Sequence, residues 1–237
     1  MKKLIFGILV ICLLLAGCGK TQDPAPDATT GATESTDSGA ENNQEISGGE
    51  EQKEPAVTVY PLPDSTMENL TDATIAISLE EGNAYVDDTG KMQMNVKIYT
   101  YDMYDAADIA NLKVGDIIAA HAGDVAVTSV ERGENGNVYV NGGLEAGGFE
   151  LVPGSGGTFC EIGFNDAKNW YEVGEATIRV SADFMGYDNS DPDKGEVLIY
   201  PGDFLVDAVE NYDFTPHNTT VRIEGGQIVE MNRIFTP

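Results

Sequence analysis

One loop of the chain gathers four carboxylates within nine residues. They belong to Asp188, Asp191, Asp193 and Glu196. Ca²⁺ prefers oxygen ligands of this kind, so the loop is a candidate calcium site. Its spacing differs from that of an EF-hand, because Lys194 occupies the position where that loop needs glycine. The alternative is a solvated turn, since Asp, Asn, Ser, Pro and Gly are also ordinary turn residues. Calcium is the one cofactor that the sequence suggests.

A second group of side chains has the chemistry of a ligand-binding surface. Tyr99, Tyr101 and Tyr104 lie close together in the sequence and are mixed with acids, and Trp170 is the only tryptophan of the chain. Aromatic rings beside carboxylates can hold sugars by stacking and hydrogen bonding, or cations by charge. These four residues are therefore the candidates for a groove that binds a carbohydrate or cationic ligand. The alternative is that a helix or a second sheet covers this face.

The chain offers few residues for nucleophilic or zinc chemistry. Cys160 is the only cysteine of the folded part, and its neighbour Glu161 is not the basic partner that a reactive thiol needs, so an inert side chain is expected. With two histidines, His121 and His217, a three-histidine zinc site is impossible. The serine within residues 154–157 lacks the G-x-S-x-G spacing of a hydrolase. No catalytic residue is assigned.

The N-terminus has the three parts of an export signal. Lys2 and Lys3 supply positive charge, residues 4–16 are apolar, and small residues precede Cys18. A transmembrane helix needs about 20 apolar residues, whereas a signal peptide needs about 7–15. The apolar stretch therefore predicts a signal peptide.

The sequence Leu15-Ala16-Gly17-Cys18 resembles the lipobox of bacterial prolipoproteins, in which an aliphatic residue and two small residues precede a cysteine. The resemblance covers residues 1–18. It implies that residues 1–17 are removed as a signal peptide and that the thiol of Cys18 is alkylated with diacylglyceryl. Membrane lipid would then hold the protein on the outer face of the bacterial cell membrane, since each buried methylene adds roughly 0.8 kcal/mol. The alternative is an ordinary secretory signal or an uncleaved anchor.

An acidic segment, residues 18–56, separates the signal from the folded part. Between residues 19 and 55 there are nine acids and two bases, no aromatic residue, and one large aliphatic residue, Ile46. A segment with so little to bury cannot offset its chain entropy, so we expect a disordered tether that carries the lipidated cysteine. A recognition segment is the alternative, although no motif supports it.

The charge of the whole chain limits its partners. Its 237 residues carry 40 acids and 13 bases, a net charge of -27. Nucleic-acid binding needs a basic surface that releases counterions, so nucleic acid is excluded as a partner. The same field favours cations or cationic ligands.

The remaining residues, 57–237, have the pattern of one β-rich exported domain. Polar and apolar residues alternate over 91–98 and over 177–184, which predicts two half-buried strands. Asn135-Gly136 predicts a tight hairpin that follows a strand at 125–131.

Gly225-Gly226 predicts another hairpin, followed by a strand at 228–235. Because Ile228 and Val229 are adjacent apolar residues, we expect a bulge or a buried edge there.

Helical signals are few and short. Asp105 could cap a helix over 106–112, and residues 201–212 place their apolar side chains on one helical face. In a further strand, Cys160 is expected on the same face as Ile162 and Phe164. The predicted fold is mainly β, an antiparallel sandwich or barrel with one or two short helices.

These patterns favour a membrane-anchored, extracytoplasmic lipoprotein that acts as a non-catalytic ligand-binding or interaction module. One alternative is an extracellular hydrolase that uses paired carboxylates. Another is the solute-binding lipoprotein of a transporter, but that class usually needs two α/β lobes, and helix is scarce here.

Overall fold

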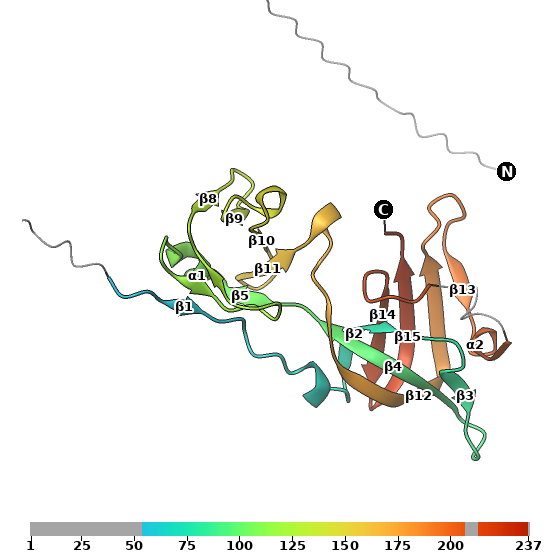
Figure 1. Cartoon of the computed structure of the whole chain (residues 1–237). Coiled ribbons are helices and arrows are strands. Elements are labelled where there is room, and N and C mark those ends of the chain that lie inside the picture. The colour runs from blue at the N-terminus through green and yellow to red at the C-terminus, as the bar shows by residue number, and fades with distance from the viewer. Residues whose placement is uncertain (1–53, 207–212, 237) are drawn as a thin grey trace, which may run out of the picture. The chain divides into compact units, whose positions relative to one another are not determined.

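The computed structural model describes residues 54–206 and 213–236. The expectations for the signal peptide, for Cys18 and for most of the tether lie outside these ranges. The described part is mainly β with two short α-helices, as predicted (Figure 1).

The strands of the larger sheet are β2 (Ala73–Ser78), β3 (Ala84–Val86), β4 (Met92–Thr100), β12 (Tyr171–Asn189), β13 (Val197–Ile199), β14 (Thr219–Glu224) and β15 (Gln227–Ile234). The smaller sheets contain β1 (Thr58–Val59), β5 (Met103–Asp105), β6 (Ile117–Ile118), β7 (Val125–Ala126), β8 (Val130–Arg132), β9 (Val138–Val140), β10 (Phe149–Pro153) and β11 (Thr158–Ile162). The helical elements are η1 (Thr66–Glu68), α1 (Ala106–Asn111), η2 (Leu144–Ala146), η3 (Phe164–Asp166) and α2 (Asp203–Val206).

Five strands of the larger sheet close into a barrel. β2 pairs with β4, β4 with β12, β12 with β15, β15 with β14, and β14 back with β2. Within this ring the β12–β15 pairing is parallel and the others are antiparallel. β3 and β13 add to β4 and β12.

The two strands predicted from alternation lie in this barrel. In β4, Met94, Val96 and Ile98 are at most 1% exposed and alternate with half-buried polar residues, because successive side chains point to opposite faces. The strand predicted at 177–184 is the middle of β12. The first part of β12 pairs with β4 and its second part with β15, and the register with β15 shifts between Val180 and Met185.

The hairpin predicted at Gly225-Gly226 joins β14 to β15, and both glycines have positive φ. The predicted bulge is also confirmed. Arg222 lies opposite Glu230 and Ile223 lies opposite Ile228, so Val229 is an extra residue in β15.

A second hydrophobic core forms from residues inserted between β4 and β12, together with β1. The sheet here has the order β5-β11-β10-β9-β8, and α1 packs beside it. As predicted, Asp105 caps α1, because its carboxylate accepts the N–H of Ala107 at 2.7 Å. Cys160 is 6% exposed, as expected, and burial raises the pKa of its thiol.

Two details of the strand prediction were wrong. Residues 125–131 do not form one strand: β7 pairs with β6, and β8 pairs with β9. The chain bends between them because Asn141 Oδ1 accepts the N–H groups of Thr128 and Ser129. Phe164 does not share a strand face with Cys160, because β11 ends at Ile162.

The helix expected over 201–212 begins as α2, in which Phe204 is buried in the barrel core. Residues 207–212 lie outside the described ranges. None of the helices in the described part of the chain is long and apolar enough to cross a membrane.

Candidate functional site

A cavity of about 720 Å³ lies where three segments of the chain meet. They are residues 164–170 between β11 and β12, residues 213–220 leading into β14, and residues 232–236 at the end of β15. Small-molecule sites have volumes of roughly 300–1,000 Å³ and combine apolar walls with a few polar groups. The lining mixes apolar and polar side chains. The apolar ones are Phe164, Ala167, Trp170, Pro216 and Ile234, and the polar ones are Asn165, Lys168, Asp213, Thr215, His217, Asn218, Thr219, Thr220, Asn232 and Thr236.

A sharp turn after β11 brings Phe164 to the cavity. Asn165 adopts a φ of 62°, a left-handed conformation that asparagine tolerates better than most residues. The N–H of Gly163 donates to the carbonyl of Ala167 at 2.6 Å and closes the turn. A side chain at Gly163 would meet Asn169 Oδ1 at 2.5 Å, so glycine suits this close approach. The turn leaves Phe164 74% exposed, with its ring available to a ligand.

Trp170 is held in place by Tyr101 and Lys168. The rings of Tyr101 and Trp170 meet edge to face, with centroids 4.8 Å apart. Lys168 Nζ lies 4.0 Å from the centroid of Tyr101 and 5.6 Å from that of Trp170, and it donates to Tyr101 Oη at 2.9 Å. These contacts fix the orientation of the indole, which remains half-buried and lines the cavity.

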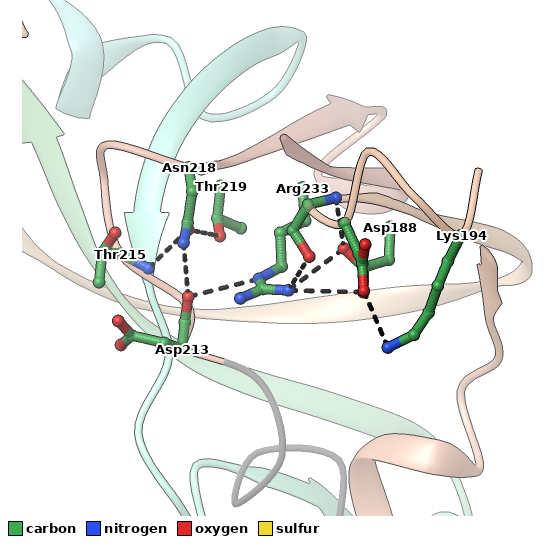
Figure 2. Close-up of polar contacts among 9 residues, drawn as sticks. Asp188, Lys194, Asp213, Thr215, Asn218, Thr219 and Arg233 are labelled. Atoms are coloured by element: carbon green, nitrogen blue, oxygen red, sulfur yellow. Dashed lines mark hydrogen bonds and ion pairs between the residues drawn. The ribbon is translucent and has the colours of Figure 1, made fainter. Parts of the chain in front are cut away.

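The loop that leads into β14 is organised by Asn218 (Figure 2). Asn218 Oδ1 accepts the N–H of Thr215 at 3.0 Å and the hydroxyl of Thr219 at 2.6 Å. Its Nδ2 donates to the carbonyl of Asp213 at 2.7 Å. One buried amide thus satisfies the polar groups of a whole turn and fixes this wall of the cavity.

Arg233 ties the same loop to two strands, as Figure 2 shows. Its Nε donates to the carbonyl of Asp213 at 3.4 Å, and its Nη1 lies 3.2 Å from Asp188 Oδ1 at the end of β12. The Arg233 and Asp188 side chains are 13% and 12% exposed. Removing either partner of an ion pair buried to this degree leaves the other charge uncompensated and destabilises the fold.

Asn232 carries an unsatisfied acceptor at the cavity. Its Oδ1 is buried and has no hydrogen-bond partner among the described residues. Asn232 lies directly opposite Thr220 across the β14–β15 ladder, so both side chains point to the same face of the sheet, and both line the cavity. A buried acceptor without a donor costs about 1–3 kcal/mol. A ligand that donates a hydrogen bond to Asn232 would remove this cost.

The four aromatic residues named as candidates for one groove do not lie together. Trp170 lines the cavity and Tyr101 supports it from behind. Tyr99 lies on the outer face of β4, where its Oη is 3.1 Å from Ser78 Oγ. Tyr104 is fully buried in the second core and donates to the carbonyl of Ala119, so a ligand cannot reach it. Tyr104 lies apart from Tyr99 because the chain leaves β4 at Thr100 and enters a different sheet at β5, which ends the alternation of side chains along β4.

A buried pair of acids lies away from the cavity. Asp102 accepts the hydroxyl of Tyr171 at 3.0 Å and the N–H of His121 at 2.6 Å, and the His121 and Tyr171 rings stack with centroids 3.7 Å apart. Glu161 accepts the amide of Asn169. Burial raises the pKa of Glu161, and the charge of Asp102 raises it further. Burial and the bond to Asp102 likewise raise the pKa of Tyr171.

Two of the four acids of the candidate calcium loop pair with cations of the chain. Asp188 pairs with Arg233, and Asp191 with Lys194 at 2.9 Å. Asp193 and Glu196 are exposed. Among the described residues there is no group of three or more His, Cys, Asp or Glu that could hold a metal ion. Calcium binding at this loop stays a prediction.

Sequence reasoning missed Phe164, Asn232 and the loop at 213–220 as parts of one site. The turn residues Gly163 and Asn165 were the available signal for Phe164, because they end β11 before it. Asn232 gives no local signal, since polar residues on the outer face of a strand are common. Comparison of the chain with models of protein families, with curated proteins and with solved structures finds no match.

Proposed function

We propose that this protein is a lipid-anchored, extracytoplasmic binding module that holds a ligand in the cavity beside Trp170. The lipobox at residues 15–18 supports the anchor, and the acidic segment that follows supports display on a spacer. Acids in the segment and in the folded part are repelled by an anionic membrane surface, which favours a ligand site that stands away from it.

The observation that carries the binding function is the lining of the cavity. Phe164 and Trp170 present aromatic rings, and Asn232 presents a buried acceptor without a donor. The hydrogen bonds of Asn218 and Arg233 position the wall that completes the cavity. A site prepared in this way orders few groups on binding, which favours affinity.

Trp170 gives a direct test, because it is the only tryptophan of the chain and it lines the cavity. The full chain, purified in a detergent without a sugar head group, would be titrated with saccharides, with a polyamine and with a proline-rich peptide. We expect one of these classes to change the emission of Trp170 saturably, and to do so less in a Phe164→Ala variant. If none of the three classes changes the emission, the cavity is not the binding site of this protein.

The anchor has its own test, which is independent of the cavity. Mass spectrometry of the N-terminal peptide from membranes should find Cys18 as the first residue, with a diacylglyceryl group on its sulfur. A Cys18→Ser variant should be released from the membrane fraction. An unmodified Cys18, or cleavage at another position, would contradict the lipoprotein assignment.

The pair of Asp102 and Glu161 supports a second candidate, a hydrolase. A carboxyl with a raised pKa beside a second carboxyl is the arrangement that acid–base hydrolysis needs. However, Asp102 and Glu161 are 4% and 9% exposed, and both already accept hydrogen bonds from the protein. Turnover of an oligosaccharide that disappears in Glu161→Gln would favour this candidate over the binding module.

A further inference from the structure

The polar groups of the cavity favour a ligand that donates hydrogen bonds. Asn232 Oδ1 is a buried acceptor without a partner, and Asn232 lies on the same sheet face as Thr220. Asn218, by contrast, uses its amide groups within its own loop. Among the amides of the lining, Asn232 is the one whose acceptor is buried without a hydrogen-bond partner among the described residues, and its side chain has to turn toward the cavity before a ligand hydroxyl or N–H group can reach it.

The apolar groups of the cavity favour a ligand with a flat C–H surface. Phe164 is 74% exposed, a high value for a phenylalanine, and Trp170 is held edge-on by Tyr101. The turn at Gly163 and the contact with Tyr101 fix these two rings independently of any ligand. Fixed aromatic rings with polar groups beside them bind amphipathic ligands at small entropic cost.

The charges of the cavity argue against a cationic ligand. Lys168 lines the cavity, and its ammonium group already lies over the face of Tyr101 and near Trp170. An ammonium group of a ligand over the same rings would meet like charge. Asp213 lines another wall and would repel an anion. One cation and one carboxylate thus leave a site suited to a neutral ligand.

From these three observations we infer that the cavity binds a neutral carbohydrate, with sugar C–H faces against Phe164 and Trp170 and a sugar hydroxyl donating to Asn232. This inference rests on the proposed function, because it names the ligand class of the same cavity. It selects one of the two ligand classes that the sequence suggested, and it assigns Phe164 and Asn232 to the site.

The test is a set of titrations followed by the emission of Trp170. The probes are a cello-oligosaccharide, a chito-oligosaccharide and a manno-oligosaccharide, compared with spermine and with a proline-rich peptide. The protein is the full chain in a detergent without a sugar head group. We expect at least one oligosaccharide to bind saturably, with an affinity that changes little between low and high salt because the ligand is uncharged.

Variants locate the binding. Phe164→Ala and Asn232→Ala should each weaken the oligosaccharide roughly 2- to 10-fold, the effect of losing one aromatic contact or one neutral hydrogen bond. Tyr60→Ala, which removes an aromatic side chain that is 67% exposed but does not line the cavity, should leave the affinity unchanged. Because Phe164 is mostly exposed, its variant should fold even if Asn232→Ala does not.

The outcomes distinguish a failure of the carbohydrate inference from a failure of the proposed binding function. Saturable binding of spermine or of the peptide alone would overturn the carbohydrate inference and leave the cavity as a binding site. Oligosaccharide binding that Phe164→Ala and Asn232→Ala do not weaken would place the sugar elsewhere and overturn the inference. A lack of response to every probe would overturn both the inference and the proposed function.

Discussion

Replacing Arg233 with methionine should destabilise the protein more than replacing any exposed arginine. The change leaves the Asp188 carboxylate 12% exposed without its cation, and removing one partner of a buried ion pair costs about 3–5 kcal/mol. The N–H of Ser190 still donates to Asp188 Oδ1 at 3.0 Å, so we expect the lower end of that range, about 3 kcal/mol. For a chain of this size the melting temperature should fall by about 6–12 °C.

The matched control is Arg222→Met in the neighbouring strand. Arg222 contacts Glu230 at 2.9 Å and also Glu224, but its side chain is 42% exposed. An exposed ion pair contributes about 0–1 kcal/mol, so this variant should lose little stability. Urea unfolding followed by the fluorescence of Trp170 measures both variants.

A double variant separates the ion pair from the other contacts of Arg233. Adding Asp188→Asn to Arg233→Met removes the uncompensated charge, so the double variant should be more stable than Arg233→Met alone. Equal losses in Arg233→Met and Arg222→Met would refute the argument, as would a double variant whose losses simply add.

Three further predictions concern two buried side chains and one closely packed glycine. Burial raises the pKa of Glu161 above its ordinary value of 4.5. The stability that the Glu161 carboxyl contributes is therefore complete below pH 4.5 and is lost as the pH rises through the folded-state pKa. In urea midpoints measured against pH, Glu161→Gln should flatten this decline. Tyr104→Phe leaves the carbonyl of Ala119 without its donor and should cost about 1 kcal/mol in the same urea assay, and an unchanged midpoint would contradict the assigned hydrogen bond. Gly148→Ala would place a methyl group 2.1 Å from the carbonyl oxygen of Val140 and should lower the stability by about 1–3 kcal/mol, whereas a neutral effect in thermal unfolding would contradict this packing.

Local patterns predicted the parts of the fold that local physics decides. The alternation in β4 gave a strand because one face of it is buried in the barrel, where Met94 and Ile98 are fully enclosed. The adjacent apolar residues Ile228 and Val229 gave a bulge because an extra residue lets both pack without changing the register of the rest of β15.

Long-range pairings were beyond prediction for a physical reason. In the parallel pairing of β12 with β15, Val180 lies opposite Ile228, almost 50 residues away in the sequence. Neither strand has a local pattern that identifies its partner. The bend between Thr128 and Ser129 depends on Asn141, which lies in a different turn. The cavity is of the same kind, because its three segments are far apart in the sequence and meet only in the folded chain.

The packing of Tyr101 on Trp170 and the exposure of Phe164 have one cause, which also explains why the site lies where it does. Residues 101 and 102 connect β4 to β5, and residues 163–170 connect β11 to β12, so both are links between the barrel and the inserted sheet. A link cannot bury its side chains by alternation, and its aromatic residues must pack on one another or face solvent. Tyr101 and Trp170 do the first, and Phe164 does the second. A ligand that covers Phe164 and Trp170 would therefore bury the apolar surface that neither core can reach.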